Sequence, residues 1–285
     1  MNKVVEYSWP EDIVVLKGIL TQGSFPVHSH DFCEIAIIQG GGGVYTDNYG
    51  ERPLLPGDVF VLRKPEYHGF SKLDRLKIIN ILFVPERLAL PFDELRKITG
   101  YNVLFEIEPF LPGGANRSSL NLSPEELRRL NDYVEMIEQE LEQRQPGYRI
   151  KLKSRLLDVI IFLSRKYSSA TDYSAADCHH LLGETIAYIE THYRDKHTLA
   201  MLSRRAGMSK PHFIRMFKKI TGLPPVDYVN KTRIDQACKL LGKNQTSITQ
   251  AALACGFADS NYFSRTFKKY MGMSPRKYIK TYLNQ

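Results

Sequence analysis

The stretch from Ile248 to Tyr278 reads I-T-Q-A-A-L-A-C-G-F-A-D-S-N-Y-F-S-R-T-F-K-K-Y-M-G-M-S-P-R-K-Y. The same pattern occurs once before it, from Leu199 to Tyr228. Eight residues recur 50 positions apart, whereas Gly207 and Gly256 are 49 apart, so the second copy has one extra residue in its turn. The recurring residues are Phe213, Arg215, Phe217, Lys218, Lys219, Gly222, Pro225 and Tyr228, then Phe263, Arg265, Phe267, Lys268, Lys269, Gly272, Pro275 and Tyr278.

Each copy predicts a helix, a short turn and a second helix. In the first copy Gly207 supplies the left-handed residue that commonly ends a helix. Ser209 is a suitable N-cap, and Pro211 stands just inside the next helix, where its missing N–H costs little. Gly222 ends this second helix. The chain is therefore expected to contain two helix-turn-helix units, at residues 199–220 and 248–271.

The second helix of each unit has a face that suits DNA. In a helix-turn-helix motif this helix enters the major groove. Arg bonds guanine bidentately and Asn does the same with adenine, whereas Lys further along the helix suits phosphates. Asp259 falls on the same outward face. The predicted DNA-binding residues are Lys210, His212, Ile214, Arg215 and Lys218 in the first helix, and Ser260, Asn261, Ser264, Arg265 and Lys268 in the second.

Two amphipathic helix pairs with ordinary solvated basic faces would show part of this pattern. Two copies in register, with Arg215 and Arg265 at the same place, favour DNA binding over that alternative. The charge distribution agrees, because there are 18 Lys and Arg against 6 Asp and Glu from Leu181 onward, and 21 against 25 before it. The net charge of +8 thus comes entirely from the repeated region, as expected for a polyanion partner.

The stretch 248–278, together with its first copy, resembles the signature of the AraC/XylS family of bacterial transcription regulators. The resemblance covers about Leu181–Gln285 and implies a linking helix at about Pro225–Leu241 that places two recognition helices in successive major grooves. It also implies a promoter-binding activator that forms a homodimer and contacts RNA polymerase. Base-contacting positions of the family fall on Pro211, Ile214 and Arg215 in the first helix and on Ser260, Asn261 and Arg265 in the second. Pro211 and Ile214 depart from it, because neither side chain can hydrogen-bond a base.

The 285 residues suit two domains and a connector. The polar start of the chain shows no secretion signal, and no run approaches the ~20 apolar residues of a membrane helix. The four cysteines, Cys33, Cys178, Cys238 and Cys255, are scattered without paired spacing and read as free thiols. A cytoplasmic protein without a membrane partner is expected.

Residues from about 13 to 84 predict short β-strands separated by turns. Turn signals stand at Gly40–Gly43, Asp47–Gly50 and Pro56–Asp58. Short strands at regular spacing predict a sandwich or a double-sheet barrel. Before Ser123, only Phe92–Ile98 suggests a short helical piece. The expected strands are Ile13–Ile19, Glu34–Ile38, Val44–Tyr45, Val59–Leu62 and Leu76–Val84.

The sequence H-S-H-D-F-C-E lies at residues 28–34 in this region. On one strand, the histidines and Glu34 would point to the same face. With P-G-D at 56–58 and P-E-Y-H at 65–68, these pieces resemble the two motifs of the cupin superfamily, which implies a jelly roll. In metal-binding cupins the matching positions hold one divalent ion, and three imidazoles with one carboxylate suit Fe, Mn, Ni, Cu or Zn. The candidate metal ligands are His28, His30, Glu34 and His68.

The same side chains could instead hydrogen-bond an organic effector. AraC/XylS regulators commonly have a cupin-like sensor, and F-P-V-H-S-H-D-F-C-E at residues 25–34 resembles the corresponding stretch of rhamnose-responsive members. The resemblance implies a monosaccharide effector, onto which aromatic rings would stack. The candidate effector-binding residues are His28, His30, Glu34, His68, Phe32 and Tyr45.

Two helices are predicted after the strands. Ser123–Glu126 is a strong helix start, with a Ser N-cap, Pro at the first position and Glu three residues later. An apolar seam of about two heptads follows, consisting of Leu127, Leu130, Val134, Ile137 and Leu141. It is either a dimer interface, which the family resemblance favours, or the buried face of a helix packed on its own barrel. Arg149–Tyr167 predicts the second helix, and Ser168–Ala176 a linker.

The predicted fold is an α+β two-domain chain. A cupin-like effector-sensing jelly roll occupies residues 1–112, a helical dimerisation region with the linker 113–180, and an all-α DNA-binding domain 181–285. The expected function is a transcription regulator under the control of a small molecule. The alternative is a metal-dependent cupin enzyme or a metal-responsive regulator. A catalytic cupin has no need of the basic repeated half, so enzymatic activity is not expected.

Overall fold

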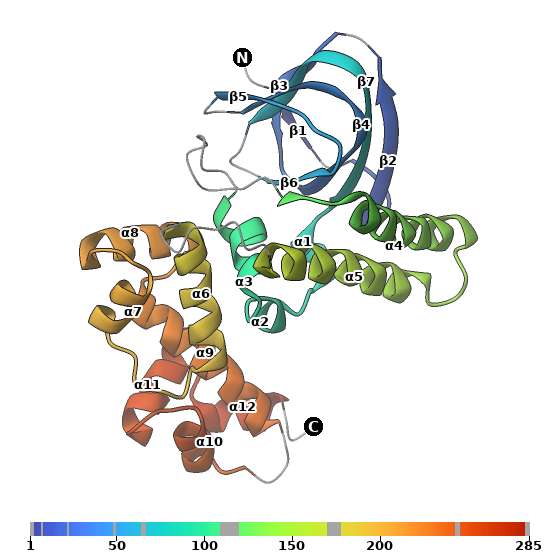
Figure 1. Ribbon diagram of the computed structural model, residues 1–285. Helices are drawn as coiled ribbons and strands as arrows, with labels where there is room; N and C mark the ends of the chain where they lie inside the picture. The colour runs from blue at the N-terminus through green and yellow to red at the C-terminus, as the bar shows by residue number, and fades with distance from the viewer. Residues whose placement is uncertain are drawn as a thin grey trace. The chain divides into compact units, whose positions relative to one another are not determined.

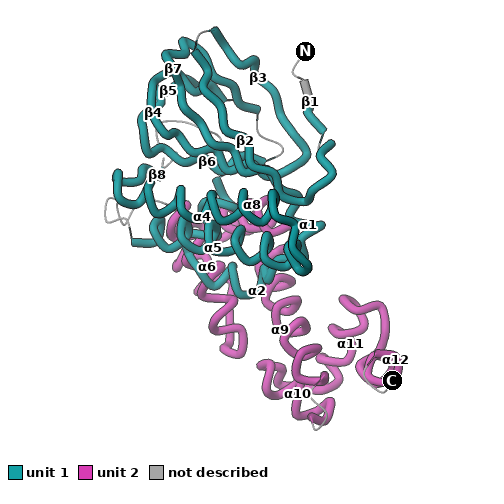
Figure 2. Tube along the Cα trace, turned by 90° about the vertical axis from the view of Figure 1, so that its right-hand side faces the viewer, with its two compact units in different colours: residues 1–172 teal, residues 173–285 magenta. Residues whose placement is uncertain are grey.

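The computed structural model describes residues 3–6, 8–21, 23–47, 50–63, 67–108, 120–169, 178–242 and 246–282. The chain forms two compact units, Met1–Asp172 and Tyr173–Gln285 (Figure 1 and Figure 2). A β-sheet unit therefore precedes an all-helical unit, which confirms the predicted α+β class. Helices expected in a separate region at residues 113–180 belong to the first unit up to residue 172.

The first unit is built on one curled sheet (Figure 1). Within the described residues the path of neighbouring strands is β1-β3-β7-β4-β6-β8, with β2 also paired to β7 and β5 to β4. All pairs are antiparallel except β1 with β3. The strands are β1 (Lys3–Val5), β2 (Ile13–Leu20), β3 (Phe25–His30), β4 (Cys33–Asp47), β5 (Gly50–Pro53), β6 (Asp58–Leu62), β7 (His68–Phe83) and β8 (Leu120–Asn121).

The turn predicted at Gly40–Gly43 is wrong, because these glycines lie inside the 15-residue strand β4. Pairing with β7 continues across them through register shifts between Ile38 and Val44. Gly41 has φ +74, and a Cβ there would lie 2.1 Å from the carbonyl oxygen of Arg75. A glycine run can bend a strand through bulges as readily as it can end one. The chain uses it here to curl β4 and β7 together.

The sheet has two buried faces. Alternate residues of β4 point to opposite sides, so Ala36 and Ile38 join an interior cluster while Ile35 and Ile37 are buried on the other side. The predicted interior of an all-β sensor is thus largely filled by its own side chains. The cluster consists of Ala36, Ile38, Tyr45, Leu54, Phe60, Leu62, Phe70, Leu76 and Ile78.

Helices α4 (Pro124–Gln143) and α5 (Tyr148–Ser169) are as expected from the sequence, and the capping box of Ser123 and Glu126 is present. The apolar seam of α4 is used within the chain. Leu130, Val134 and Ile137 have no exposed surface, and α4 packs along α5. The seam is therefore used as the buried face of a helix packed on its own domain, the second of the two alternatives that the sequence left open.

Between the sheet and α4 the chain is more helical than predicted. Helix α1 (Pro85–Leu88), α2 (Phe92–Leu95) and α3 (Thr99–Tyr101) lead into a π-helix, η1 (Asn102–Ile107). Only α2 falls in the predicted piece. Such short helices carry no readable period. Of the predicted linker, Ser168 and Ser169 belong to α5 and residues 170–177 lie outside the described residues.

The second unit consists of α6 (Cys178–Thr191), α7 (Leu199–Arg205), α8 (Lys210–Thr221), α9 (Pro225–Leu241), α10 (Ile248–Ala254), α11 (Ser260–Met271) and α12 (Pro275–Tyr282). Both helix-turn-helix units and the linking helix α9 are confirmed. Gly207 and Gly256 have φ +64 and +82 at the two turns. Phe213, Phe217, Phe263 and Phe267 are fully buried. Across the described parts of both units, no helix is long and apolar enough to cross a membrane.

The burial of the α4 seam predicts a stability effect. Ile137→Ala should lower the free energy of unfolding of the first unit by about 2–5 kcal/mol, because it leaves a cavity against α5. Met136→Ala, at a neighbouring position that is 37% exposed, should leave stability nearly unchanged. Urea denaturation followed by circular dichroism measures both. Equal midpoints for the two variants would contradict the intrachain packing of the seam.

Candidate DNA-binding and effector sites

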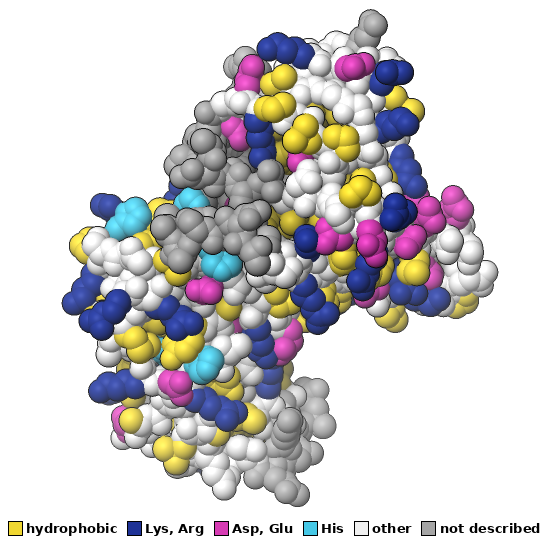
Figure 3. All heavy atoms as spheres, in the orientation of Figure 1, with side chains coloured by type: hydrophobic (Ala, Val, Ile, Leu, Met, Phe, Trp, Pro, Cys, Tyr) yellow, Lys and Arg dark blue, Asp and Glu magenta, His cyan; other side chains and the backbone are white. Residues whose placement is uncertain are grey.

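The recognition helices α8 and α11 expose the residues predicted to contact DNA. Lys210, His212, Arg215 and Lys218 are exposed on α8, as are Ser260, Asn261, Arg265 and Lys268 on α11. Ile214 and Ser264 are half-buried. The phenylalanines of each helix point the other way, into the core. Figure 3 shows Lys and Arg side chains spread over the visible face of this unit.

Asp259 does not belong to the reading face. Its carboxylate caps α11, accepting hydrogen bonds from the backbone N–H of Asn261 at 3.0 Å and of Tyr262 at 2.8 Å. These bonds lower the pKa of Asp259. The corresponding Ser209 makes no side-chain bond to α8. A negative charge held at the start of α11 stabilises the helix N-terminus, and so the outward placement of Asp259 reflects capping.

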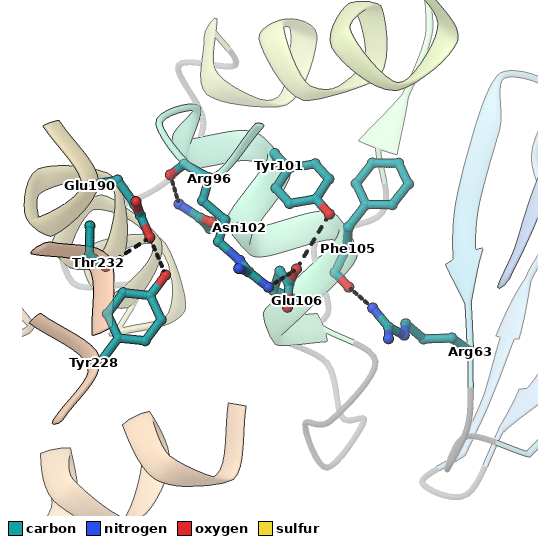
Figure 4. A network of polar contacts seen from close by, with 9 residues as sticks. All are labelled: Arg63, Arg96, Tyr101, Asn102, Phe105, Glu106, Glu190, Tyr228 and Thr232. Carbon is teal, nitrogen blue, oxygen red and sulfur yellow. Dashed lines mark hydrogen bonds and ion pairs between the residues drawn. The ribbon is translucent and has the colours of Figure 1, made fainter. Parts of the chain in front are cut away.

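Helix α9 is fixed to the first helix-turn-helix unit by a buried carboxylate. Glu190 at the end of α6 is 4% exposed, and its Oε1 accepts a hydrogen bond from Tyr228 Oη at 2.5 Å (Figure 4). Thr232 Oγ1 lies 3.5 Å from the same oxygen. The Tyr228 ring also packs edge-on against Phe217 of α8. Removing one partner would leave a buried polar group unsatisfied, so this contact holds α6, α8 and α9 in one arrangement.

The opposite side of α9 contacts the second helix-turn-helix unit. Lys269 Nζ and Tyr270 Oη of α11 donate to Asp227 at 2.6 and 3.0 Å. Asn230 Nδ2 donates to Tyr262 Oη at 3.0 Å. These bonds contact both ends of α11 from the first two turns of α9. The orientation of the second recognition helix therefore depends on polar contacts with the linking helix, in addition to the apolar core around Phe263.

Arg233 of α9 connects the loop before the first helix-turn-helix unit to the turn of the second. It donates to the carbonyl oxygens of Tyr193 and Asp195 at 2.7 Å each, and its guanidinium lies 5.6 Å from the Phe257 ring centroid. The turn that contains Phe257 approaches the same loop, because a Cβ on Gly256 would lie 2.4 Å from the carbonyl oxygen of Arg194. The two helix-turn-helix units are thus locked to one another across α9. Sequence reasoning missed these residues, since each joins segments about 40 or more positions apart.

The candidate effector residues come from three strands. His28 and His30 lie on β3, Glu34 on β4 and His68 on β7. The prediction that residues 28–34 form one strand is wrong, because the chain bends at Asp31 and Phe32. The fold nevertheless brings the side chains together. Glu34 Oε2 lies 3.2 Å from His30 Nε2 and 3.8 Å from His68 Nε2, and the His28 ring centroid is 4.4 Å from that of His68.

The hydrogen bonds of this cluster determine which ring nitrogens carry protons. His30 Nδ1 lies 2.7 Å from Phe32 O, and His28 Nδ1 lies 3.0 Å from Pro26 O. A carbonyl only accepts, so Nδ1 is the donor and Nε2 of each neutral ring is an acceptor. In His30 that acceptor, Nε2, faces the Glu34 Oε2 oxygen, and the two acceptors repel each other unless a donor or a positive charge lies between them. A second proton, a cation or a ligand hydroxyl would supply that donor or charge.

Two further predicted residues have different surroundings. Phe32 stacks on His30 with ring centroids 4.1 Å apart, so it belongs to the cluster. Tyr45 is fully buried in the interior core, stacked on Phe60 at 4.7 Å. The Arg52 guanidinium lies over both of these rings, 5.1 and 4.4 Å from their centroids. The structure therefore places Tyr45 in the packed core, where the Phe70 ring is a shared neighbour, with centroids 5.9 Å from Tyr45 and 6.2 Å from His68.

The cluster also has a donor set that fits a divalent cation. One ligand atom from each of His30, Glu34 and His68 can lie within 4.8 Å of the others, and all three residues are buried. Two imidazoles and one carboxylate suit several transition metals. A carbonyl that accepts Nδ1–H, as Phe32 O does, orients an imidazole for coordination through Nε2.

The described cysteines offer no reactive thiolate. Burial raises the pKa of Cys33 to about 12 and that of Cys255 to about 11. Burial also raises the pKa of Cys238. All three are free thiols, in agreement with the sequence. The side chain of Cys178 is outside the described residues.

Comparison with known proteins finds matches over both parts of the chain. A helix-turn-helix domain profile matches residues 202–281, and an AraC-like ligand binding domain profile matches residues 12–160. The HTH-type transcriptional activator RhaR of Mannheimia succiniciproducens is 26% identical over 93% of this chain and 90% of its own length. RhaS of Escherichia fergusonii is 29% identical over 93% and 91%. A structure of ToxT from Vibrio cholerae is 13% identical, covers 96% of this chain and 100% of that one, and gives a TM-score of 0.36.

The fold and the sites define a DNA-binding regulator that carries its own ligand-binding domain. The ligand-binding profile alone spans more than half of the chain. The protein belongs to the AraC family of transcription regulators, as its sequence implied.

The tie between α9 and α11 predicts a pH-dependent stability. The hydrogen bond from Lys269 is the largest cause that holds the pKa of Asp227 below its ordinary value of 3.8. A carboxylate with a depressed pKa stabilises the fold above that value, and the stabilisation is lost as the pH falls through the folded-state pKa. Asp227→Asn should therefore lower stability at pH 7, and the difference from the natural protein should shrink below about pH 3.8.

Asp235→Asn is the matched control, because Asp235 pairs with Lys231 within α9 itself. Denaturant midpoints at pH 7 and pH 3 measure both variants. The tie is refuted if the two substitutions cost the same at pH 7, or if the Asp227→Asn deficit persists undiminished at pH 3.

Proposed function

We propose that this protein is a transcription activator whose first unit binds a monosaccharide and whose second unit reads promoter DNA through α8 and α11. The observation that carries the proposal is the pair of recognition helices with solvent-exposed polar and basic faces, held on one linking helix. The curated relatives named above are transcriptional activators, which supports the sign of regulation. Effector binding would shift the population of DNA-competent states.

Arg215 and Arg265 are proposed to read bases. They stand at the same place in the two copies, and both are exposed. Asn261 and Ser260, at the start of α11, are placed where residues of a recognition helix meet base edges. Lys218 and Lys268 lie one turn further along, where phosphates are the expected partners. The first helix, with Pro211 and half-buried Ile214, would then depend on Arg215, Lys210 and His212 for polar contacts.

The buried histidine cluster is proposed as the monosaccharide site. Sugar hydroxyls both donate and accept, so they can bridge the Nε2 acceptors and the Glu34 carboxylate. Phe32, stacked on His30, adds an aromatic surface of the kind that sugar rings contact. The resemblance of residues 25–34 to rhamnose-responsive regulators supports the same ligand class.

A divalent metal at His30, Glu34 and His68 is the second candidate, favoured by the convergence of their ligand atoms. A bound cation would resolve the contact between His30 Nε2 and the carboxylate. In that case the protein would be a metal-responsive regulator, or the metal would orient the organic effector. Metal content of the purified protein and its response to a chelator separate these possibilities from a metal-free sugar site.

A homodimer and contact with RNA polymerase complete the proposal. The surface that joins two copies would lie elsewhere than on Leu130, Val134 and Ile137, because these side chains are fully buried within the chain. Sedimentation with and without effector would test for the dimer.

A specific duplex is first selected from a random pool with the natural protein. Arg265→Ala is expected to lower the preference for this duplex over random DNA by about 1–3 kcal/mol, because it removes a base contact. Lys268→Ala, on the same helix, should weaken binding to both duplexes alike and reduce the salt slope by about 1. Binding titrations at several salt concentrations measure both. If Arg265→Ala weakens the two duplexes equally, its role in base reading is disproved.

A monosaccharide that binds the cluster should raise the melting temperature of the full chain, since it binds the folded state alone. Glu34→Gln and His30→Ala should abolish the shift, whereas Tyr45→Phe and Asp31→Asn should keep it. A screen of aldoses and deoxyaldoses by thermal shift, with and without EDTA, provides the measurement. A shift that survives Glu34→Gln would place the sugar elsewhere.

A further inference from the structure

The first unit contains a partly enclosed cavity, none of whose lining residues belongs to the histidine cluster. Its volume is about 140 Å³. It lies between the end of the sheet, the short helices α1 to η1 and helix α5. We call it the η1 cavity. Its lining includes Cys33, Arg63, Phe92, Arg96, Tyr101 and Glu106, with Phe83 and Ile160 among the apolar walls.

Cys33 and Glu34 are neighbours on β4 and therefore point to opposite sides of the strand. Glu34 lies in the histidine cluster, and Cys33 lines the η1 cavity. Residues Arg63 and Phe83 line the cavity from the ends of β6 and β7. The two sites thus share one wall of the sheet but no lining residue.

The polar groups of the cavity are arranged around η1. Figure 4 shows Arg63 reaching from the sheet to η1, while Tyr101 and Arg96 converge on Glu106. Arg63 Nη1 donates to Phe105 O at 3.1 Å. Glu106 Oε1 accepts from Tyr101 Oη and Arg96 Nη2, at 3.3 Å each. A π-helix is rare and is frequently found at functional sites, and here both Phe105 and Glu106 of η1 line the cavity.

The cavity lining carries two guanidinium groups, of Arg63 and Arg96, and two carboxylates, of Glu86 and Glu106. The Glu106 charge is offset by Arg96, whereas Glu86 is exposed to solvent at the rim, where its charge is screened. Arg63 is half-buried, and its positive charge opposes the burial that raises the pKa of Cys33, whereas the charges of Glu34, Glu86 and Glu106 raise that pKa further. A guanidinium binds a carboxylate bidentately and strongly in such surroundings.

The size and the apolar walls restrict what can bind. A cavity of about 150 Å³ holds a benzene molecule, so the η1 cavity has room for one six-membered ring and little more. Phe83, Phe92 and Ile160 would contact the ring. We propose that the η1 cavity is a second small-molecule site, which binds a carboxylate whose apolar body is no larger than one six-membered ring. The bound molecule would contact both the sheet and α5.

The test uses the full chain, with benzoate as the probe and benzamide as its neutral counterpart of nearly the same shape. Benzoate should raise the melting temperature in proportion to the logarithm of its concentration, and titration calorimetry should give one site per chain. Benzamide should bind at least roughly tenfold more weakly, since it lacks the charge-assisted contact. Equal effects of the two compounds would overturn the proposal.

Three variants locate the site. Arg63→Met should lose the benzoate response, and Arg63→Lys should recover part of it. Cys33→Met fills the cavity without changing any charge, so it should abolish binding while keeping the fold, which circular dichroism checks. His30→Ala should leave benzoate binding intact, and this separates the η1 cavity from the proposed sugar site. Benzoate binding that persists in Cys33→Met, or that is lost in His30→Ala, would show that the probe binds elsewhere.

Discussion

The second unit depends on the hydrogen bonds that attach helix α9 to its neighbours. Two amphipathic helix pairs would each fold around their own phenylalanines, but such cores leave the pairs free to rotate about a linking helix. The buried bond from Tyr228 to Glu190 and the pair of bonds that Asp227 accepts remove this freedom on the two sides. Arg233 closes the remaining side by binding two carbonyl groups of the α6–α7 loop. The proposed contact of both recognition helices with one DNA duplex needs this fixed geometry, because energy spent on ordering the helices would be lost from DNA affinity.

A different constraint governs the first unit. Most of its sheet interior is filled by aliphatic and aromatic side chains, and at one end three histidines and a carboxylate are buried together. Buried charge is expensive unless a partner compensates it. A sensor can use this, since a ligand that supplies the missing donors or charge gains more in a dry site than it would in water. The same end of the sheet carries the η1 cavity on its other face, so both sites lie next to the first residues of β4.

Much of this organisation is readable from the sequence. The repeat at a spacing of 50, with glycine and proline at the ends of its helices, predicts α7 to α11 and the linking helix, because caps and helical periods are local signals. The histidines were correctly grouped for a partly wrong reason: residues 28–34 bend between two strands, and the third strand brings His68 to them. Gly40–Gly43 was misread because a bulge and a turn need the same residue. The seam of α4 was ambiguous, since a helix has the same apolar period whether it packs on α5 or on a second copy of the chain.

The remaining residues could not be found in this way. Glu190, Asp227 and Arg233 look like ordinary surface charges in the sequence, and their partners are about 40 positions away. The η1 cavity depends on a π-helix and on short helices without a period. Tyr45 was grouped with the effector residues by its chemistry, although packing against Phe60 places it in the core.

The close approach of Gly256 to the carbonyl of Arg194 bears on how such domains can diverge. Any side chain at position 256 would collide with the backbone of the α6–α7 loop at Arg194, where no rotamer change can relieve the clash. The second half of the repeat therefore does not fold as a module independent of the α6–α7 loop, despite its similarity to the first half. A hybrid that joins the first half of this chain to the second half of a relative would assemble only if the incoming turn also lacked a Cβ at this point.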